Sequence, residues 1–153
     1  MTKVALVVVM TLSSLQLATN AGSETAAAQK THPVTEFTAL ARLAFVECSL
    51  SIKIDLLSPD DGKQSSLFPK YTDCRDKNLP QLKTKFQAAT SNVSGKAEAL
   101  SLLKDFYAHW LASIDGLVPQ SGEIRMAYNS RTNGNEAELA RQAKRIEIEL
   151  GLE

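Results

Sequence analysis

The stretch that decides the fold class is "ECSLSIKIDLLSP", residues 47 to 59. From Leu50 to Leu56 the apolar residues fall on every second position, which is the period of a half-buried strand. Over the longer window that begins at Phe37, however, apolar residues recur at steps of three and four, which is the period of a helix. One helical face collects Phe37, Ala41, Ala44, Cys48 and Ile52.

A second apolar set lies on the opposite side of this helix and consists of Ala39, Leu43, Leu50, Ile54 and Leu57. A helix with two apolar faces produces the observed alternation when only seven residues are sampled. A strand would need a partner, and the only other alternating stretch is "RIEIELGL", residues 145 to 152. Because two strands alone are marginally stable, we predict helices for both segments, with a small two-stranded ribbon in an α+β fold as the alternative. We expect the second apolar face to be covered from within the chain; a second copy or another partner is the alternative.

Three further amphipathic segments follow. The first covers residues 68 to 91, with a break near Pro80 as an alternative to one helix. The next, "KAEALSLLKDFYAHWLASIDGL" (residues 96 to 117), carries an unbroken apolar stripe: Leu100, Leu103, Tyr107, Trp110, Ile114 and Leu117. The last keeps one helical phase from Ile124 to Leu150, although a fresh start at Asn135 is an alternative. Residues 35 to 153 are therefore predicted to form an all-α, antiparallel four-helix bundle.

The first 21 residues differ from the rest of the chain. Lys3 supplies a positive start, the run "VALVVVMTLSSLQLA" is apolar, and small residues near Ala21 fit a cleavage site. We interpret residues 1 to 21 as a secretory signal peptide, with a buried N-terminal helix as the alternative. Residues 22 to 34 contain no large apolar side chain before Val34 and are predicted to be a disordered tether. The protein is then exported, to a periplasm or outside the cell, with no membrane segment after signal removal.

The chain contains two cysteines, Cys48 and Cys74. Because an oxidising compartment favours pairing, we predict a disulfide between them, with two buried free thiols as the alternative. Closing this loop would stabilise the fold by about 3 to 4 kcal/mol in the chain-entropy model.

Charge and motif content exclude several function classes. The sequence has 17 basic and 17 acidic residues, so it lacks the basic excess of a nucleic-acid binder. Only two histidines are present, His32 and His109, and no zinc, haem or phosphate-binding motif occurs, so no metal or cofactor is predicted. Glu47 is the one carboxylate with a conceivable general-acid role if buried, but pairing with a lysine at the helix edge is favoured. Asn92-Val93-Ser94 is a glycosylation acceptor in a eukaryotic source only.

The densest group of polar and aromatic residues is Tyr107, Trp110, Arg125, Tyr128 and Arg131. These residue types anchor partner surfaces, and they also pack the ends of cores. We predict a non-catalytic binding or protein-interaction module whose partner is another protein or an envelope component. The alternative is a carboxylate-dependent envelope hydrolase, which would need a cleft with at least two converging ionisable groups.

Overall fold

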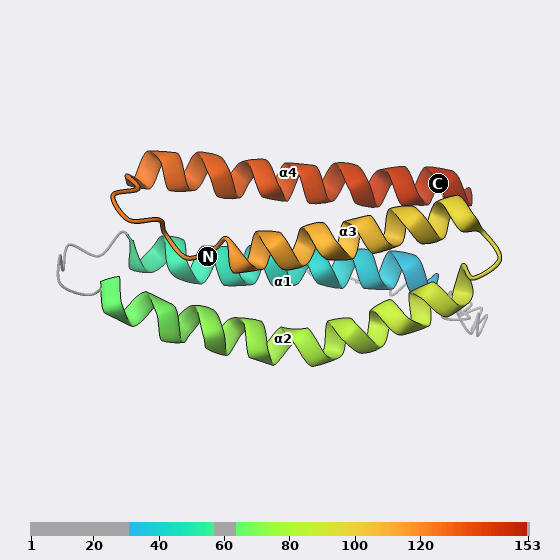
Figure 1. Cartoon of the computed structure of the whole chain (residues 1–153), viewed down its shortest axis with the longest axis horizontal. Helices are drawn as coiled ribbons and strands as arrows, with labels where there is room; N and C mark the ends of the chain where they lie inside the picture. Colours follow the sequence, from blue (N-terminus) through green and yellow to red (C-terminus); the bar gives the residue numbers. More distant parts are fainter. Residues whose placement is uncertain (1–30, 57–63, 153) are drawn as a thin grey trace, which may run out of the picture.

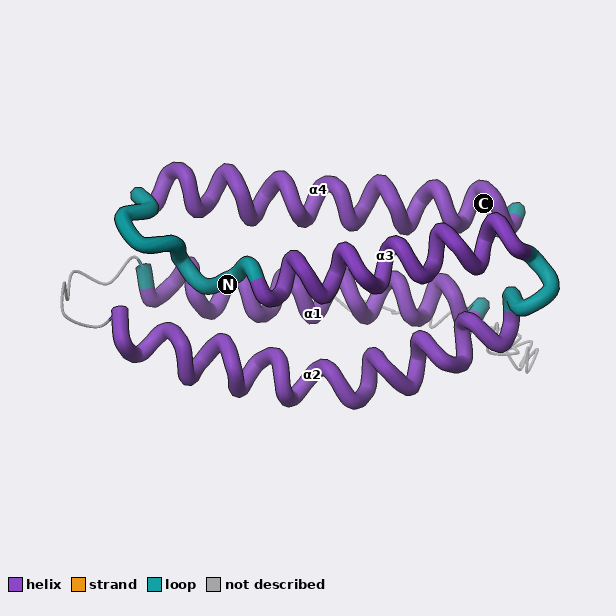
Figure 2. Tube along the Cα trace, viewed as in Figure 1, coloured by secondary structure: helices purple, strands orange, loops and turns teal. Residues whose placement is uncertain are grey.

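The computed structural model describes residues 31–56 and 64–152, and its elements are all helical within these ranges. They are α1 (Pro33–Asp55), α2 (Gln64–Asn92), α3 (Ala97–Asp115) and α4 (Arg125–Leu150) (Figures 1 and 2). The predicted all-α bundle is confirmed, and the alternative with a two-stranded ribbon is wrong for the described part of the chain. The predicted signal peptide and residues 22 to 30 of the predicted tether lie outside these residues.

The helices run alternately up and down, and each packs mainly against two neighbours. α1 packs against α2 and α4, and α3 packs most against α4, whereas α2 and α4 lie on opposite sides of the bundle and do not meet. Figure 1 shows α4 at the top and α2 at the bottom, with α3 drawn in front of α1. α1 and α3 therefore occupy opposite corners, and the outward side of α1 points away from α3.

The core is built from the faces that the helical periodicity predicts. On α1, Phe37 has no exposed surface, and its ring contacts those of Phe86, Phe106 and Tyr107 at centroid distances of 5.5, 5.7 and 5.9 Å. Such tilted and edge-on aromatic pairs add to the free energy of burial. Trp110 of α3 is also fully buried, and its indole Nε1–H donates to the carbonyl oxygen of Ala41 at 2.7 Å. This bond joins α3 to α1 across the centre of the bundle.

The chain becomes helical slightly before the predicted boundary. α1 begins at Pro33, two residues earlier than predicted. Proline suits the first position of a helix because the backbone N–H that it lacks would have no partner within the helix there. His32, which we assigned to the tether, is the N-cap residue, and its Nδ1 accepts from the Val34 backbone N–H at 3.3 Å.

The predicted alternatives of a broken α2 and a broken α4 are both wrong. α2 continues through Pro80, which lacks the N–H that would bond the Asp76 carbonyl, and Figure 1 shows this helix curved along its length. α4 continues through Gly134, whose surroundings are open, and ends at Gly151 in the left-handed conformation (φ 65°) that favours glycine. Ile124 is the exposed N-cap residue of α4 rather than part of its core face.

Candidate functional site

The outward side of α1 carries three large apolar residues that no described helix covers. Leu43, Leu50 and Ile54 are 64%, 53% and 56% exposed, and together they are called the outer face here. Our expectation that the chain covers this face from within is wrong for these residues. Ala39 is exposed as well, and Leu57 lies outside the described residues.

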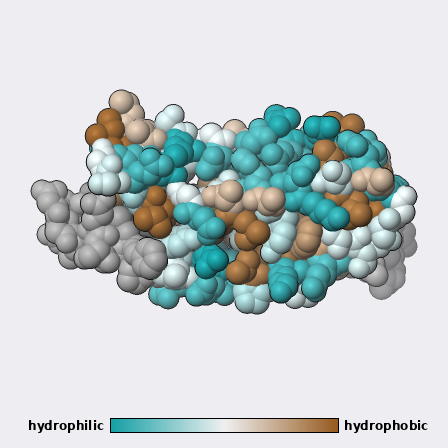
Figure 3. Space-filling view, in the orientation of Figure 1, coloured by the Kyte–Doolittle hydropathy of each residue, from teal (hydrophilic) through white to brown (hydrophobic). Residues whose placement is uncertain are grey.

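The position of α1 at a corner of the bundle explains why the outer face stays open. A helix in the centre of a fold is covered on all sides, whereas a helix in a four-membered bundle presents one stripe to its neighbours. The face with Phe37, Ala41 and Cys48 fills the core, and α2 and α4 flank it. Leu50 and Ile54 point away from all three neighbours. Figure 3 shows the opposite side of the molecule, where α3 lies in front of α1, and hydrophobic residues occur there in small groups among hydrophilic ones.

Charged residues border the outer face, with acids on one edge and bases on the other. Towards α2, the carboxylate of Glu47 pairs with Lys77 Nζ at 2.8 Å, and Glu36 pairs with Lys85. Towards α4, Lys53 Nζ donates to Asn133 Oδ1 at 2.8 Å. Glu47 is exposed and paired with a lysine, as favoured from the sequence, so the burial that a general-acid role required is absent.

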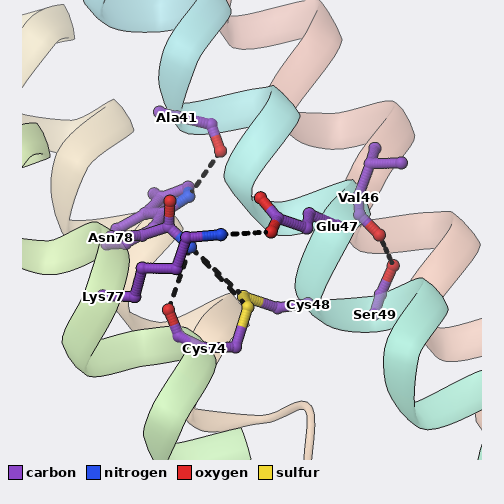
Figure 4. The surroundings of a disulfide bond; sticks show 9 residues. Ala41, Val46, Glu47, Cys48, Ser49, Cys74, Lys77 and Asn78 are labelled. Carbon is purple, nitrogen blue, oxygen red and sulfur yellow. Dashed lines mark hydrogen bonds and ion pairs between the residues drawn. A yellow bond between two sulfur atoms is a disulfide. The ribbon is translucent and has the colours of Figure 1, made fainter.

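The predicted disulfide lies next to this acidic edge and fastens α1 to α2. Cys48 and Cys74 are bonded, with 5.7 Å between their Cα atoms (Figure 4). The buried Asn78 amide covers the bridge: its Nδ2 donates to the Cys74 carbonyl oxygen at 2.9 Å and lies 3.8 Å from Cys48 Sγ. Because Glu47 and Cys48 are neighbours on α1, and Cys74 and Lys77 lie within one turn of α2, the bridge and the ion pair together hold this part of α1 in a fixed orientation.

The five residues that we singled out as a binding group do not share a surface. Trp110 and Tyr128 have no exposed area and pack the core, Tyr107 stacks on Trp110 with 6.2 Å between ring centroids, and of the five only Arg125 is exposed. Arg131 lies over the Tyr128 ring with its guanidinium carbon 5.3 Å from the centroid. The structure therefore brings four of them together as two pairs, Tyr107 with Trp110 and Tyr128 with Arg131, and within the described residues Arg125 forms no ion pair or ring contact with either pair.

Arg131 fastens the loop between α3 and α4. Its Nε and Nη2 donate to the two carboxylate oxygens of Glu123, each at 2.8 Å, and its Nη1 donates to the Gly116 carbonyl oxygen. The Arg131 hydrogen bonds, followed by one from the Gln120 backbone N–H, lower the pKa of Glu123 from 4.5 to about 2. The Arg131–Glu123 pair is bidentate, and the Glu123 side chain is only 9% exposed, so the role of the pair is to stabilise the loop between α3 and α4.

Replacing Arg131 with Met should lower the free energy of unfolding by about 1.5 to 3 kcal/mol near neutral pH, because charged hydrogen bonds are lost. The pKa of Glu123 is lowered in the folded state, so its contribution is present above its ordinary value of 4.5 and is lost as pH falls towards 2. The free energies of unfolding of wild type and Arg131→Met, measured by urea denaturation, should therefore become more similar as the pH falls from 4.5 towards 2. Arg125→Met, on the same helix but at an exposed position, is the control and should behave as wild type. A difference that stays constant with pH would contradict this assignment.

A shallow polar groove lies between α3 and α4. It is lined by Leu102, Asp105, Arg141, Gln142 and Arg145 and has a volume of about 120 Å³. Pockets for drug-sized ligands are larger, roughly 300 to 1,000 Å³. The groove therefore has room for a few water molecules or a very small group.

The acidic group at the rim of this groove is held in its ionised form. Arg141 Nε and Gln142 Nε2 both donate to Glu138 at 2.8 Å, and these hydrogen bonds, that from Arg141 first, lower the pKa of Glu138 to about 2. Such a carboxyl does not suit a general acid near neutral pH. His109, half-buried on α3, has a buried Nε2 with no hydrogen-bond partner among the residues that the structure describes.

Comparisons with known proteins gave no match: no protein-family model, no curated protein and no solved structure is similar to this chain. Within the described ranges, no helix is long and apolar enough to cross a membrane. Nor do three or more His, Cys, Asp or Glu side chains gather there in a group that could hold a metal ion.

Proposed function

We propose that this chain is a small exported helical protein that acts as a non-catalytic protein-interaction module and binds its partner through the outer face of α1. The observation that carries the proposal is the alignment of Leu43, Leu50 and Ile54, each more than half exposed, on one side of one helix. Contiguous apolar surface of this kind marks interaction sites on soluble proteins. The signal-like N-terminus and the Cys48–Cys74 bridge support export.

A single exposed apolar residue is common on protein surfaces, and Ile148 of α4 is such a case at 59% exposure. The outer face differs because its members follow one another at helical spacing and line a single stripe. Helices at a bundle surface ordinarily turn polar residues outward. Three outward positions of α1 are apolar instead of polar, as we expect for a surface that a partner covers.

The alternative of a carboxylate-dependent hydrolase receives less support. Such a mechanism needs a concave site in which one carboxyl is held protonated while another is ionised. The α3–α4 groove is small, and the neighbouring Glu138 has a lowered pKa. Glu47, the other candidate, is exposed and paired with Lys77.

Ile54→Asp tests the proposal. Because Ile54 is already 56% exposed, its replacement leaves a hydrated carboxylate, and the urea midpoint should stay close to that of wild type. A photo-crosslinking amino acid at position 50, in cells that produce the protein, should give crosslinked protein adducts, and Ile54→Asp should abolish them.

Ile148 provides the matched controls, since it is equally exposed but lies far along α4 from Met126, the other exposed large apolar residue of that helix. A crosslinker at position 148 should give no specific adduct, and Ile148→Asp should leave the adducts at position 50 unchanged. If Ile54→Asp unfolds the bundle, the outer face is buried and the proposal is wrong. Absence of adducts at position 50 would contradict it equally.

A further inference from the structure

We infer that the occupant of the outer face is a second copy of this chain, whose own α1 packs against the first in parallel orientation. This inference rests on the proposed function, because it requires the outer face to be a binding surface. It adds the identity of the partner and the direction in which the partner's helix runs.

The spacing of the outer face suits a helix of the same kind. Leu43 and Leu50 are seven residues apart, and the half-buried Val46 lies between them on the same stripe. These are the a, d and a positions of a heptad, the pattern with which two helices interlock side chains. Ile54 follows four residues after Leu50, at position e, and widens the stripe towards α2.

The charges along the stripe indicate whether two α1 helices would pack in parallel or in antiparallel orientation. On the edge towards α4, Arg42 occupies position g and is exposed, and it has no ion-pair partner among the described residues. On the edge towards α2, Glu47 occupies position e and pairs with Lys77 beyond it, and both side chains are about half exposed or more (49% and 69%). One edge of the stripe thus carries a base at position g that is unpaired within the described residues, and the other carries an acid at position e that shares its charge with Lys77.

Two copies related by a two-fold axis can place these edges in two ways. In an antiparallel pair, e faces e and g faces g, so each edge would meet the like edge of the second copy. In a parallel pair, g faces the e position five residues further along the second helix, which sets Arg42 of each copy opposite Glu47 of the other. Symmetry forms this contact twice, so the charges favour the parallel pair.

The corner position of α1 permits this contact without rearrangement. α1 lies opposite α3, and α2 and α4 flank it on its inner side, so no described helix stands between the outer face and a second copy. The Cys48–Cys74 bridge on the core face of α1 and the Glu47–Lys77 pair at its edge fix the orientation of α1 against α2. An interface of one helix face is small, so we expect a dimer that dissociates on dilution.

Sedimentation equilibrium of the mature protein, at concentrations up to about 1 mM for a weak interface, tests the inference. Wild type should dimerise reversibly, and Ile54→Asp should be monomeric throughout. Arg42→Glu and Glu47→Arg should each raise the dissociation constant about tenfold, because each sets like charges opposite one another twice. The double variant, with the two charges exchanged, should restore dimerisation, and Ile148→Asp should not affect it.

The outcomes separate this inference from the proposed function. A monomer at all concentrations, together with adducts from position 50 to a different protein, would overturn the second copy as partner and leave the proposed function standing. A monomer without adducts would overturn both. If Ile54→Asp still dimerises, the dimer forms through another surface and the inference is wrong. If the double variant with Arg42→Glu and Glu47→Arg fails to dimerise, the two α1 helices do not run parallel.

Discussion

Leu103→Ala is expected to lower the free energy of unfolding by about 2 to 5 kcal/mol, the range for removing a fully buried leucine side chain. Leu103 lies in the middle of α3, has no exposed surface and belongs to the single core of the bundle. The substitution removes three carbon atoms from a close-packed site and leaves a cavity that the surrounding helices fill only in part. Urea denaturation followed by circular dichroism at the helical band measures the loss.

The matched control is Leu43→Ala, the same chemical change on the outer face of α1. Leu43 is 64% exposed, so its removal leaves no cavity and should change the free energy of unfolding by well under 1 kcal/mol in the monomer, by roughly the ±0.5 kcal/mol of an ordinary surface substitution. Both measurements belong at low protein concentration, where self-association does not contribute. Equal losses for the two variants would mean that α1 is covered on its outer side or that α3 is turned about its axis.

Removal of the disulfide is expected to have a comparable effect. Replacing Cys48 and Cys74 by Ala together should lower the free energy of unfolding by about 3 to 4 kcal/mol, because the bridge closes a loop over a sequence separation of 26 residues and so restricts the unfolded chain. The other residues of the hydrophobic core are unchanged by this substitution, so the helices should still pack as in wild type.

Two further measurements isolate the covalent bond from the change in side-chain volume. Wild-type protein in the presence of a reductant should lose stability to about the same extent as the double variant, since both lack the bridge. The native protein should not react with a thiol reagent before reduction and should take up two equivalents after it. Two reactive thiols in the native protein would show that the bridge does not form in the cell.

Helical periodicity, a property of neighbouring positions, was sufficient to predict the four helices. The stripe from Leu100 to Leu117 on α3 and the core face of α1 were read directly from spacings of three and four. The Cys48–Cys74 pair was predicted from the even cysteine number and the signal-like N-terminal sequence. Local rules left a break at Pro80 open, and the structure shows α2 continuing through it; the Cys48–Cys74 disulfide, which joins the preceding part of α2 to α1, helps to offset the lost backbone hydrogen bond.

Which apolar face is covered was decided by the tertiary structure alone. The sequence shows that α1 has two such faces, but a helix is covered all round only if it lies centrally, and position in a bundle depends on the packing of all its members. Trp110 and Tyr128 are the opposite case: their residue types suit a partner surface, but they are buried in the core against residues far away in the chain. The outer face of α1 remains exposed because α1 occupies a corner, where α2, α3 and α4 bury one side of it and leave Leu43, Leu50 and Ile54 on the other.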